Sequence, residues 1–334
     1  AAAARGCGVP SEVLPPLGEI DLELGRKYTS SKECFPMICT TGTFLKRILE
    51  PDCDPDRTTF FMPDHNGPCR FGQYRKLQRI IFDRLGYHGV QITSPSNADA
   101  YAALSGGHPV RFWVAAWQGI VATDLLTKLM RERVPYETVP GESERIHQKY
   151  LGEMERSLEN GAKDLPEVMR RAADAFMAVD VQGGNRKPII SVVGEIYMKD
   201  NPFANGFLVE RLEHLGAEVV MSPFRDWLAY FSFRYARDSI WKRDLGGLLK
   251  AQVQQMVQSY TAARLYKAVE PATELEMDVD LIECMSFSEP YIHNDYDGEP
   301  IMALGTAEGL ARRGISGVAH IFPFTCLPGT FVSS

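Results

Sequence analysis

Several features that assign proteins to common classes are missing from this sequence. It has no Cys-x-x-Cys pair, which argues against a zinc ribbon or a thioredoxin-type site. It has no Gly-x-Gly-x-x-Gly or Gly-x-x-x-x-Gly-Lys segment, so neither kind of nucleotide-binding loop is expected. No apolar run approaches the roughly 20 residues that span a bilayer. The first residues lack the basic-then-apolar pattern of a signal peptide, so we expect a cytoplasmic protein that does not insert into a membrane.

Positive charge is also scarce. The chain has 36 Lys and Arg residues against 43 Asp and Glu residues, which gives a formal net charge of −7. A protein that binds nucleic acid over a broad surface needs the opposite balance, so we expect no nucleic-acid partner. The length of 334 residues suits two domains, and the hydrophobic content of 45% is ordinary for a globular protein.

Cysteine is present in an odd number, which does not suggest a set of disulfides. A chain of this length does not need disulfides for stability, and no targeting segment directs it to an oxidising compartment. The thiols are therefore expected to be reduced and available to bind a metal. The seven residues are Cys7, Cys34, Cys39, Cys53, Cys69, Cys284 and Cys326.

The first half of the chain contains two cysteines at predicted helix starts. A strand at 59–62, a turn and a helix at 77–86 place Cys69 just before a helix, where free backbone N–H groups favour the thiolate. Cys34 precedes Pro36, a residue at home in the first turn of a helix. Cys39 is expected to be a small buried residue, and Cys53 to be exposed in a polar turn. A second strand at 90–95 and helices at 112–133, 142–158 and 165–181 complete this half.

The second half has the pattern of a parallel sheet. A linker at 182–188 precedes a continuous apolar strand at 189–194, a loop at 195–205, a helix at 206–215 and a strand at 217–221. Ligands of such sheets bind beyond the carboxyl ends of the strands, which is where Glu195 follows the first strand. A helical layer or lid is expected at 226–268. A strand at 281–285 carries Cys284, a possible fourth ligand, and a strand at 317–324 leads into Cys326.

These elements predict an α/β fold of two Rossmann-like lobes with parallel sheets, a helical layer, and a metal cluster in the cleft. The lobes are expected at 1–182 and 188–334, the second with a helical insertion at 226–268. Cys34, Cys69 and Cys326 each lie beside proline at a strand or helix end, and such loops converge in α/β folds. Three thiolates in a water-poor cleft suit an iron–sulfur cluster better than zinc.

Four segments in this order resemble the 2-hydroxyacyl-CoA dehydratase D-component superfamily. The branch that it resembles most is the one related to the double-cubane-cluster reductases and to the CoA-substrate-specific activase-related proteins. The segments are 32–36, 67–74, 193–197 with 201–205, and 323–329. The resemblance implies a [4Fe-4S] or double-cubane [8Fe-9S] cluster held by Cys34, Cys69 and Cys326. It also implies an actin/HSP70-like ATPase activator with its own iron–sulfur cluster, which supplies low-potential electrons at the expense of ATP.

The leading hypothesis is therefore an iron–sulfur reductase or dehydratase that acts on a small or CoA-linked substrate, as a dimer or in a larger complex. Arg70 and Glu195 lie in the matching segments and are our candidate catalytic residues, with His65 as another candidate for proton transfer. Two alternatives remain open: a non-catalytic electron-relay domain, and an α/β binding domain whose cysteines are structural or hold zinc. Because the chain ends eight residues after Cys326, we expect it to be a piece of a longer polypeptide.

Overall fold

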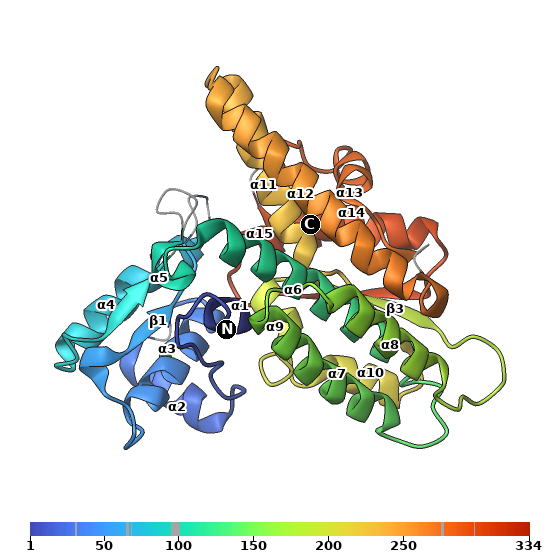
Figure 1. Cartoon of the computed structure of the whole chain (residues 1–334), viewed down its shortest axis with the longest axis horizontal. Helices are drawn as coiled ribbons and strands as arrows, with labels where there is room; N and C mark the ends of the chain where they lie inside the picture. Colours follow the sequence, from blue (N-terminus) through green and yellow to red (C-terminus); the bar gives the residue numbers. More distant parts are fainter. Residues whose placement is uncertain (31, 65–66, 68, 95–100, 275–276, 297) are drawn as a thin grey trace.

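The computed structural model describes residues 1–30, 32–64, 67, 69–94, 101–274, 277–296 and 298–334. Helices predominate, and two small parallel sheets lie in different parts of the molecule (Figure 1). The predicted mixed α/β class is confirmed. Among the helices in the part of the chain that the structure describes, none combines the length and the apolar character needed to cross a membrane.

The N-terminal lobe contains the two-stranded sheet, in which β1 (Thr59–Phe61) pairs in parallel with β2 (Gln91–Thr93). The predicted strand before Cys69 and the predicted helix after it are confirmed, and residues 65, 66 and 68 of the predicted turn lie outside the described residues. Phe44 stacks on Phe60 in the core at 4.2 Å between ring centroids. A helix at 19–28 that the sequence did not predict packs against the next one. Gly42 permits this close approach, because a Cβ there would lie 1.6 Å from the carbonyl oxygen of Asp21. The helical elements of this lobe are α2 (Glu19–Tyr28), α3 (Phe35–Ile48), η1 (Pro55–Arg57), η2 (Arg70–Gln73) and α4 (Tyr74–Arg84).

The helical body holds the largest apolar core and draws on both halves of the chain. Its helices α6, α7, α8 and α12 bury residues such as Leu126, Met169 and Leu265 together. Trp117 Nε1 donates a hydrogen bond to the carbonyl oxygen of Gln258 at 3.1 Å, which joins helices on opposite sides of the 182–188 linker. The elements are α1 (Ala2–Arg5), α5 (Ala102–Ser105), α6 (Pro109–Arg131), α7 (Glu142–Glu159), α8 (Leu165–Met177), α12 (Leu245–Val269) and η3 (Glu270–Ala272).

The C-terminal lobe contains the three-stranded parallel sheet in the order β4-β3-β5. Its central strand β3 (Ile189–Gly194) pairs with β4 (Glu218–Met221) and β5 (Gly317–Ile321), as the continuous apolar run predicts. The predicted loop at 195–205 contains a short helix, α9 (Ile196–Asp200). The other helices of this lobe are α10 (Leu208–His214), α11 (Phe224–Trp241), α13 (Leu281–Ser288), α14 (Glu299–Arg312) and α15 (Leu327–Ser333).

The predicted strand at 281–285 is wrong, because these residues form α13. A five-residue apolar run does not distinguish a strand from a buried helix. The signal that decides is the capping box: Asp280 accepts a hydrogen bond from the Glu283 amide at 2.9 Å, and Glu283 accepts one from the Asp280 amide at 3.2 Å.

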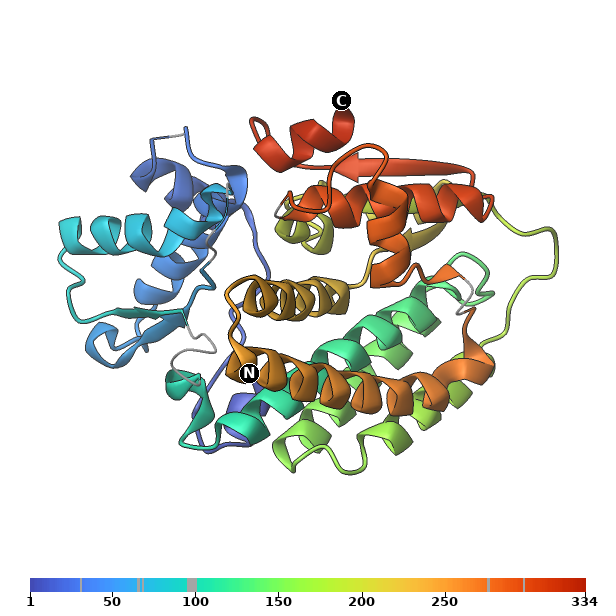
Figure 2. The same ribbon diagram turned by 90° about the horizontal axis from the view of Figure 1, so that it is seen from above.

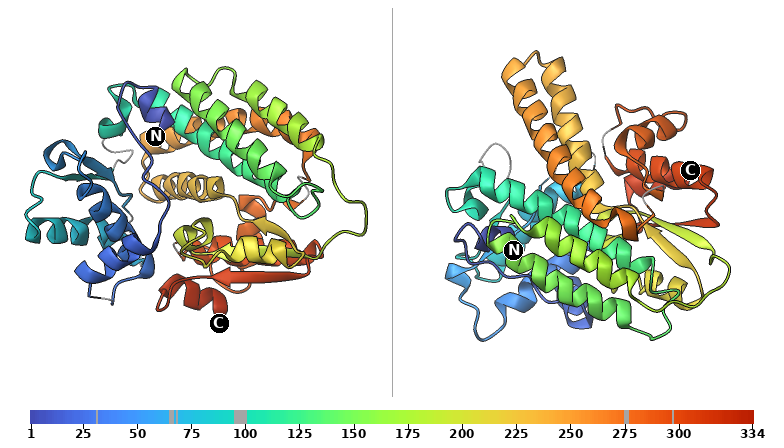
Figure 3. Two further views of the ribbon diagram at one scale, coloured as in Figure 1. Left: turned by 90° about the horizontal axis from the view of Figure 1, so that it is seen from below. Right: turned by 45° about the vertical axis from the view of Figure 1, so that its right-hand side comes forward.

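Figures 2 and 3 show how the three parts are arranged. In Figure 2, the N-terminal lobe (blue) lies at the left and the C-terminal lobe (red) at the upper right. The helices of the helical body (green and orange) lie at the lower right. The hairpin of α11 and α12 extends away from the rest of the molecule (Figure 3, right). The carboxyl end of β5 and the start of α15 lie on the side of the C-terminal lobe that the N-terminal lobe approaches.

Candidate functional site

Three cysteines cap the starts of helical segments. Cys34 is the N-cap of α3, Cys69 the N-cap of η2, and Cys326 the N-cap of α15. Two of the sulfur atoms accept backbone hydrogen bonds at these starts, Cys69 Sγ from the Phe71 amide and Cys326 Sγ from the Gly329 amide, both at 3.5 Å. The predicted helix starts at Cys34 and Cys69 and the position of Cys326 after β5 are therefore confirmed, whereas the helix that Cys326 begins was not predicted. The expectation that the helix start favours the Cys69 thiolate is opposed by burial, which raises the pKa of Cys69.

Arg70 links the segments that carry these cysteines. Its Nη1 donates to the carbonyl oxygen of Lys32 at 3.1 Å, two residues before Cys34. Its Nη2 donates to Thr325 Oγ1 at 3.0 Å, one residue before Cys326. Thr325 has φ +64°, a left-handed conformation that costs a non-glycine residue about 1 kcal/mol. The guanidinium thus bridges the two lobes at a point where the C-terminal backbone is strained.

The thiols also influence one another electrostatically. A negative charge on Cys69 raises the pKa of Cys34, and charges on Cys34 and Cys69 raise the pKa of Cys326. The hydrogen bonds of Arg70 to Lys32 and to Thr325 bring the segments that carry the three thiols together. Residues more than 250 positions apart in the sequence are gathered at the junction of the lobes.

Burial keeps the isolated thiols protonated. It raises the pKa of Cys34 to about 11, although the Tyr74 hydroxyl, which donates to Cys34 Sγ at 2.8 Å, lowers it in part. Burial likewise raises the pKa of Cys326 to about 12 and the pKa of Cys69 above its ordinary value. A bound cationic group that replaces these protons would stabilise the thiolates, as metals do at cysteine sites.

The described residues include no ready-made site for a single metal ion. Within the described ranges, no three His, Cys, Asp or Glu side chains form a group that could hold one. Cys34, Cys69 and Cys326 are free thiols, a residue type that can bind an iron–sulfur cluster.

The other cysteines named in the sequence analysis are largely covered by neighbouring residues. Cys284 is fully buried in α13, with Sγ 3.4 Å from Thr306 Oγ1, and burial raises its pKa to about 12. Cys39 is buried in α3, as predicted. Cys53 was expected to be exposed but is half-buried, with Sγ 3.4 Å from Thr58 Oγ1.

Glu195 follows the carboxyl end of β3, where the sequence placed it. Both of its oxygens are engaged in capping α9: Oε1 accepts from the Tyr197 amide at 3.2 Å and Oε2 from the Met198 amide at 2.9 Å. Burial nevertheless raises the pKa of Glu195. The carboxylate therefore positions α9 and its lysine, Lys199, at the site. His65, the other predicted proton-transfer residue, lies outside the described residues.

Glu299 is a site residue that the sequence analysis missed. It begins α14, is 8% exposed, and has no hydrogen-bond partner for Oε1 among the residues that the structure describes. Burial and the charge of Glu195 raise the pKa of Glu299 to about 8. After burial, the charge of Glu299 is one of the causes that raise the pKa of Cys69 and Cys326. The Gly-Glu-Pro segment at 298–300, which begins α14, was the available signal.

Two cavities adjoin these groups. The larger has a volume of about 230 Å³ and lies between the starts of α3 and α4. A small cavity of about 10 Å³, room for about one water molecule, lies at the carboxyl ends of β3 and β4 and is lined by Glu299 and Asp226. The larger one is lined by Lys32, Glu33, Cys34, Met37, Arg70, Gln73, Tyr74 and Leu77.

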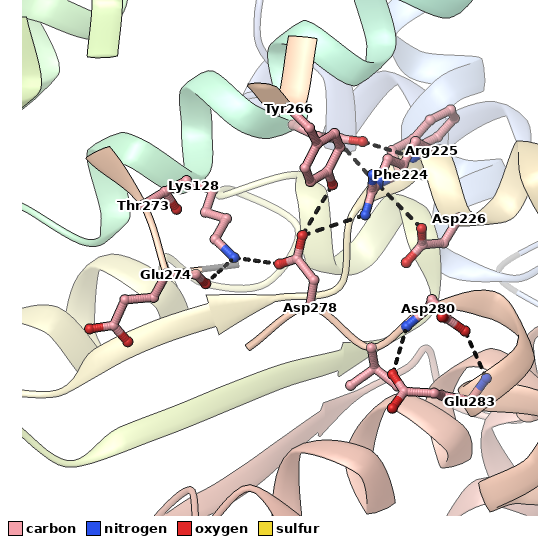
Figure 4. Close-up of polar contacts among 12 residues, drawn as sticks. Lys128, Phe224, Arg225, Asp226, Tyr266, Thr273, Glu274, Asp278, Asp280 and Glu283 are labelled. Carbon is pink, nitrogen blue, oxygen red and sulfur yellow. Dashed lines mark hydrogen bonds and ion pairs between the residues drawn. The ribbon is translucent and has the colours of Figure 1, made fainter. Parts of the chain in front are cut away.

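A polar network holds the helical body against this edge of the sheet (Figure 4). Asp278 pairs with Lys128 and accepts a hydrogen bond from the Tyr266 hydroxyl at 3.1 Å. Arg225 lies over the Tyr266 ring at 4.4 Å and pairs with Asp278 at 3.5 Å. Asp124 of α6 accepts from the Arg225 amide at 2.8 Å and so caps α11. These contacts hold the start of α11, which follows β4 in the chain, against α6.

No protein-family model, curated protein or solved structure matches the chain.

Proposed function

We propose that the chain is an iron–sulfur-cluster reductase or dehydratase-type component. In this proposal it receives low-potential electrons from an ATP-dependent actin/HSP70-like activator and passes them to a small or CoA-linked substrate. Cys34, Cys69 and Cys326 hold a [4Fe-4S] or double-cubane [8Fe-9S] cluster. The observation that carries the proposal is the bridge made by Arg70, which joins all three cysteine segments at one place.

When bound, such a cluster supplies one-electron transfer at low potential. The residues of the chain tune the sulfur atoms by hydrogen bonding. The Tyr74 hydroxyl and the amides of Phe71 and Gly329 each donate to one thiol sulfur. Donors of this kind favour the negatively charged sulfur and adjust the reduction potential of a site.

Glu299 is the residue best placed to supply a proton. Its raised pKa, about 8, keeps the carboxyl group protonated at neutral pH, and its Oε1 is not occupied by another described group. Glu195 has both oxygens engaged with backbone amides, so its contribution to catalysis is positional. Arg70 and Lys32 supply positive charge at the larger cavity.

The larger cavity favours a small substrate. Its volume of about 230 Å³ is below the range of roughly 300–1,000 Å³ that is usual for drug-sized ligands. It accommodates a small polar molecule, or only the acyl end of a CoA-linked one. Cys34 and Arg70 line it, which puts a bound substrate next to the proposed cluster.

The test is iron and sulfide analysis with EPR on protein purified anaerobically. The wild-type chain should contain both elements, and Cys69→Ala should lose iron, because it removes one of three ligands. Cys53→Ala is the matched control and should keep its iron. A colourless wild-type protein without iron would exclude the cluster and leave a binding domain. Turnover with activator, reductant and ATP distinguishes an enzyme from an electron relay.

A further inference from the structure

The wall of the larger cavity carries two positively charged side chains, Lys32 and Arg70. Arg70 donates to the Lys32 carbonyl oxygen and to the Thr325 hydroxyl oxygen, which are neutral acceptors. Arg75 of the same lobe pairs with the Asp64 carboxylate at 3.4 Å, but in the part of the chain that the structure describes neither Lys32 nor Arg70 forms an ion pair. A guanidinium has five N–H groups, so Arg70 can also donate to a bound anion.

The same wall includes a carboxylate, Glu33, whose oxygens are already engaged. Oε1 accepts from the amide and the hydroxyl of Ser30 at 3.1 and 2.9 Å, and Oε2 accepts from the Lys32 amide at 3.1 Å. Two cations and one carboxylate among the described lining residues give this wall a net positive charge, although the whole chain has a formal net charge of −7. A ligand with a single negative charge would balance the wall.

The cavity also has an apolar part. Met37, Leu77 and the Tyr74 ring line it. The Tyr74 hydroxyl donates to Cys34 Sγ at 2.8 Å, so this polar atom is already engaged. Burial of an alkyl chain against such groups is favourable, and the volume of about 230 Å³ limits that chain to a few carbon atoms.

We propose that the larger cavity binds a small aliphatic monocarboxylate. The carboxylate lies against Arg70 and Lys32, and the alkyl chain lies against Met37 and Leu77. Carboxylate and guanidinium groups are both planar and can form two parallel hydrogen bonds, which favours this anion at an arginine. The binding itself depends on the cavity alone. That the bound molecule is the substrate rests on the proposed function, in which Cys34 of the same wall holds the cluster.

This assignment narrows the class of substrate. The acyl end of a CoA thioester is uncharged and would leave the positive charge of the wall unbalanced. Inorganic phosphate carries negative charge but has no alkyl chain to cover Met37 and Leu77. A short free carboxylic acid supplies both the single negative charge and the apolar chain. A reaction at this site would therefore act on a free acid and not on its thioester.

Isothermal titration calorimetry of the full chain with sodium butyrate at constant ionic strength tests the inference. Butyrate should bind at one site with a Kd of about 1 mM, a reasonable affinity for a ligand of this size. Butyramide, which has a similar shape but no charge, should bind at least about tenfold more weakly, because hydrogen bonds between charged groups are the stronger ones. Acetate should bind about fivefold more weakly than butyrate, because it covers less apolar surface.

Arg70→Met should weaken butyrate binding at least about tenfold, and Lys32→Met about threefold. Lys32→Met keeps the Arg70 bridge, which uses only the Lys32 main chain, so it separates the loss of charge from the loss of the bridge. Arg75→Met is the matched control and should bind butyrate like the wild type, because Arg75 is not among the lining residues. Butyrate should also slow hydrogen exchange at 32–37 and 70–77.

Iron is measured on the same anaerobic samples, so that the two proposals fail separately. Butyrate binding by an iron-free chain would support the carboxylate site and exclude the cluster. A chain that contains iron but does not bind butyrate at about 50 mM would overturn this inference and leave the cluster in place. Equal affinity for butyrate and butyramide, or affinity for phosphate as high as for butyrate, would also overturn it.

Discussion

The two sheet-containing lobes contribute opposite halves of the candidate site. The N-terminal lobe supplies two thiols, the Arg70 guanidinium and the Tyr74 hydroxyl. The C-terminal lobe supplies one thiol and two buried carboxyl groups, Glu195 and Glu299. Neither lobe by itself therefore contains all of the candidate site residues. One lobe brings cationic and donor groups and the other brings acidic ones, and Arg70 joins them.

The largest expected effect tests whether the two lobes are separate units of stability. Phe82→Ala should destabilise the N-terminal lobe by about 3–5 kcal/mol, because Phe82 is fully buried in its core. Hydrogen exchange should accelerate in 35–93 and remain slow in β3 and β4.

Ile301→Ala, in the core of the C-terminal lobe, should destabilise that lobe by about 2–5 kcal/mol. Hydrogen exchange should then accelerate in β3 and β4 and remain slow in 35–93. If either variant loosens both lobes equally, they form a single cooperative unit and the comparison fails.

The second effect concerns the acidic side of the comparison. The pKa of Glu299 is raised from 4.5 to about 8 by burial, so the folded state holds a proton that the unfolded state releases between these pH values. Glu299 therefore makes the chain less stable as pH rises from about 4.5 to about 8. Glu299→Gln removes this pH dependence. The free energy of unfolding, measured with urea, should therefore fall less for the variant than for the wild type between pH 5 and pH 8.

Glu308→Gln is the control for this prediction, because Glu308 lies on the same helix and pairs with Arg312. It should keep the pH dependence of the wild type. Identical pH profiles for wild type and Glu299→Gln would show that Glu299 does not carry the extra proton. The charged groups that act on Glu299 are Glu195 and Lys199, so their variants should shift the profile in opposite directions.

The smallest effect concerns the bridge itself. Arg70→Met removes two hydrogen bonds between segments, but the side chain is exposed, so the global cost should be about 1 kcal/mol. Exchange of the amides at 323–329 should accelerate, because Thr325 loses its partner. Arg75→Met, which breaks an ion pair within the N-terminal lobe, should leave those amides unchanged. Equal acceleration in both variants would mean that Arg70 does not link the lobes.

Local patterns predicted most of the elements that carry the site. The apolar run at 189–194 and the strand–turn–helix around Cys69 were found because their residues specify a conformation over a few positions. The strand at 281–285 was wrong because a short apolar run suits both a strand and a buried helix. Glu299 was missed because its burial and its raised pKa come from neighbours distant in the sequence.

By itself, the sequence determined that Cys34 and Cys69 lie at the starts of helical segments and that Cys326 follows a strand. Those features follow from hydrogen bonds and backbone preferences within a few residues. Only the tertiary structure decided that Arg70 reaches Thr325, 255 positions away, and that Glu299 is buried. The packing of the two lobes sets these contacts, and no local pattern in the chain encodes them.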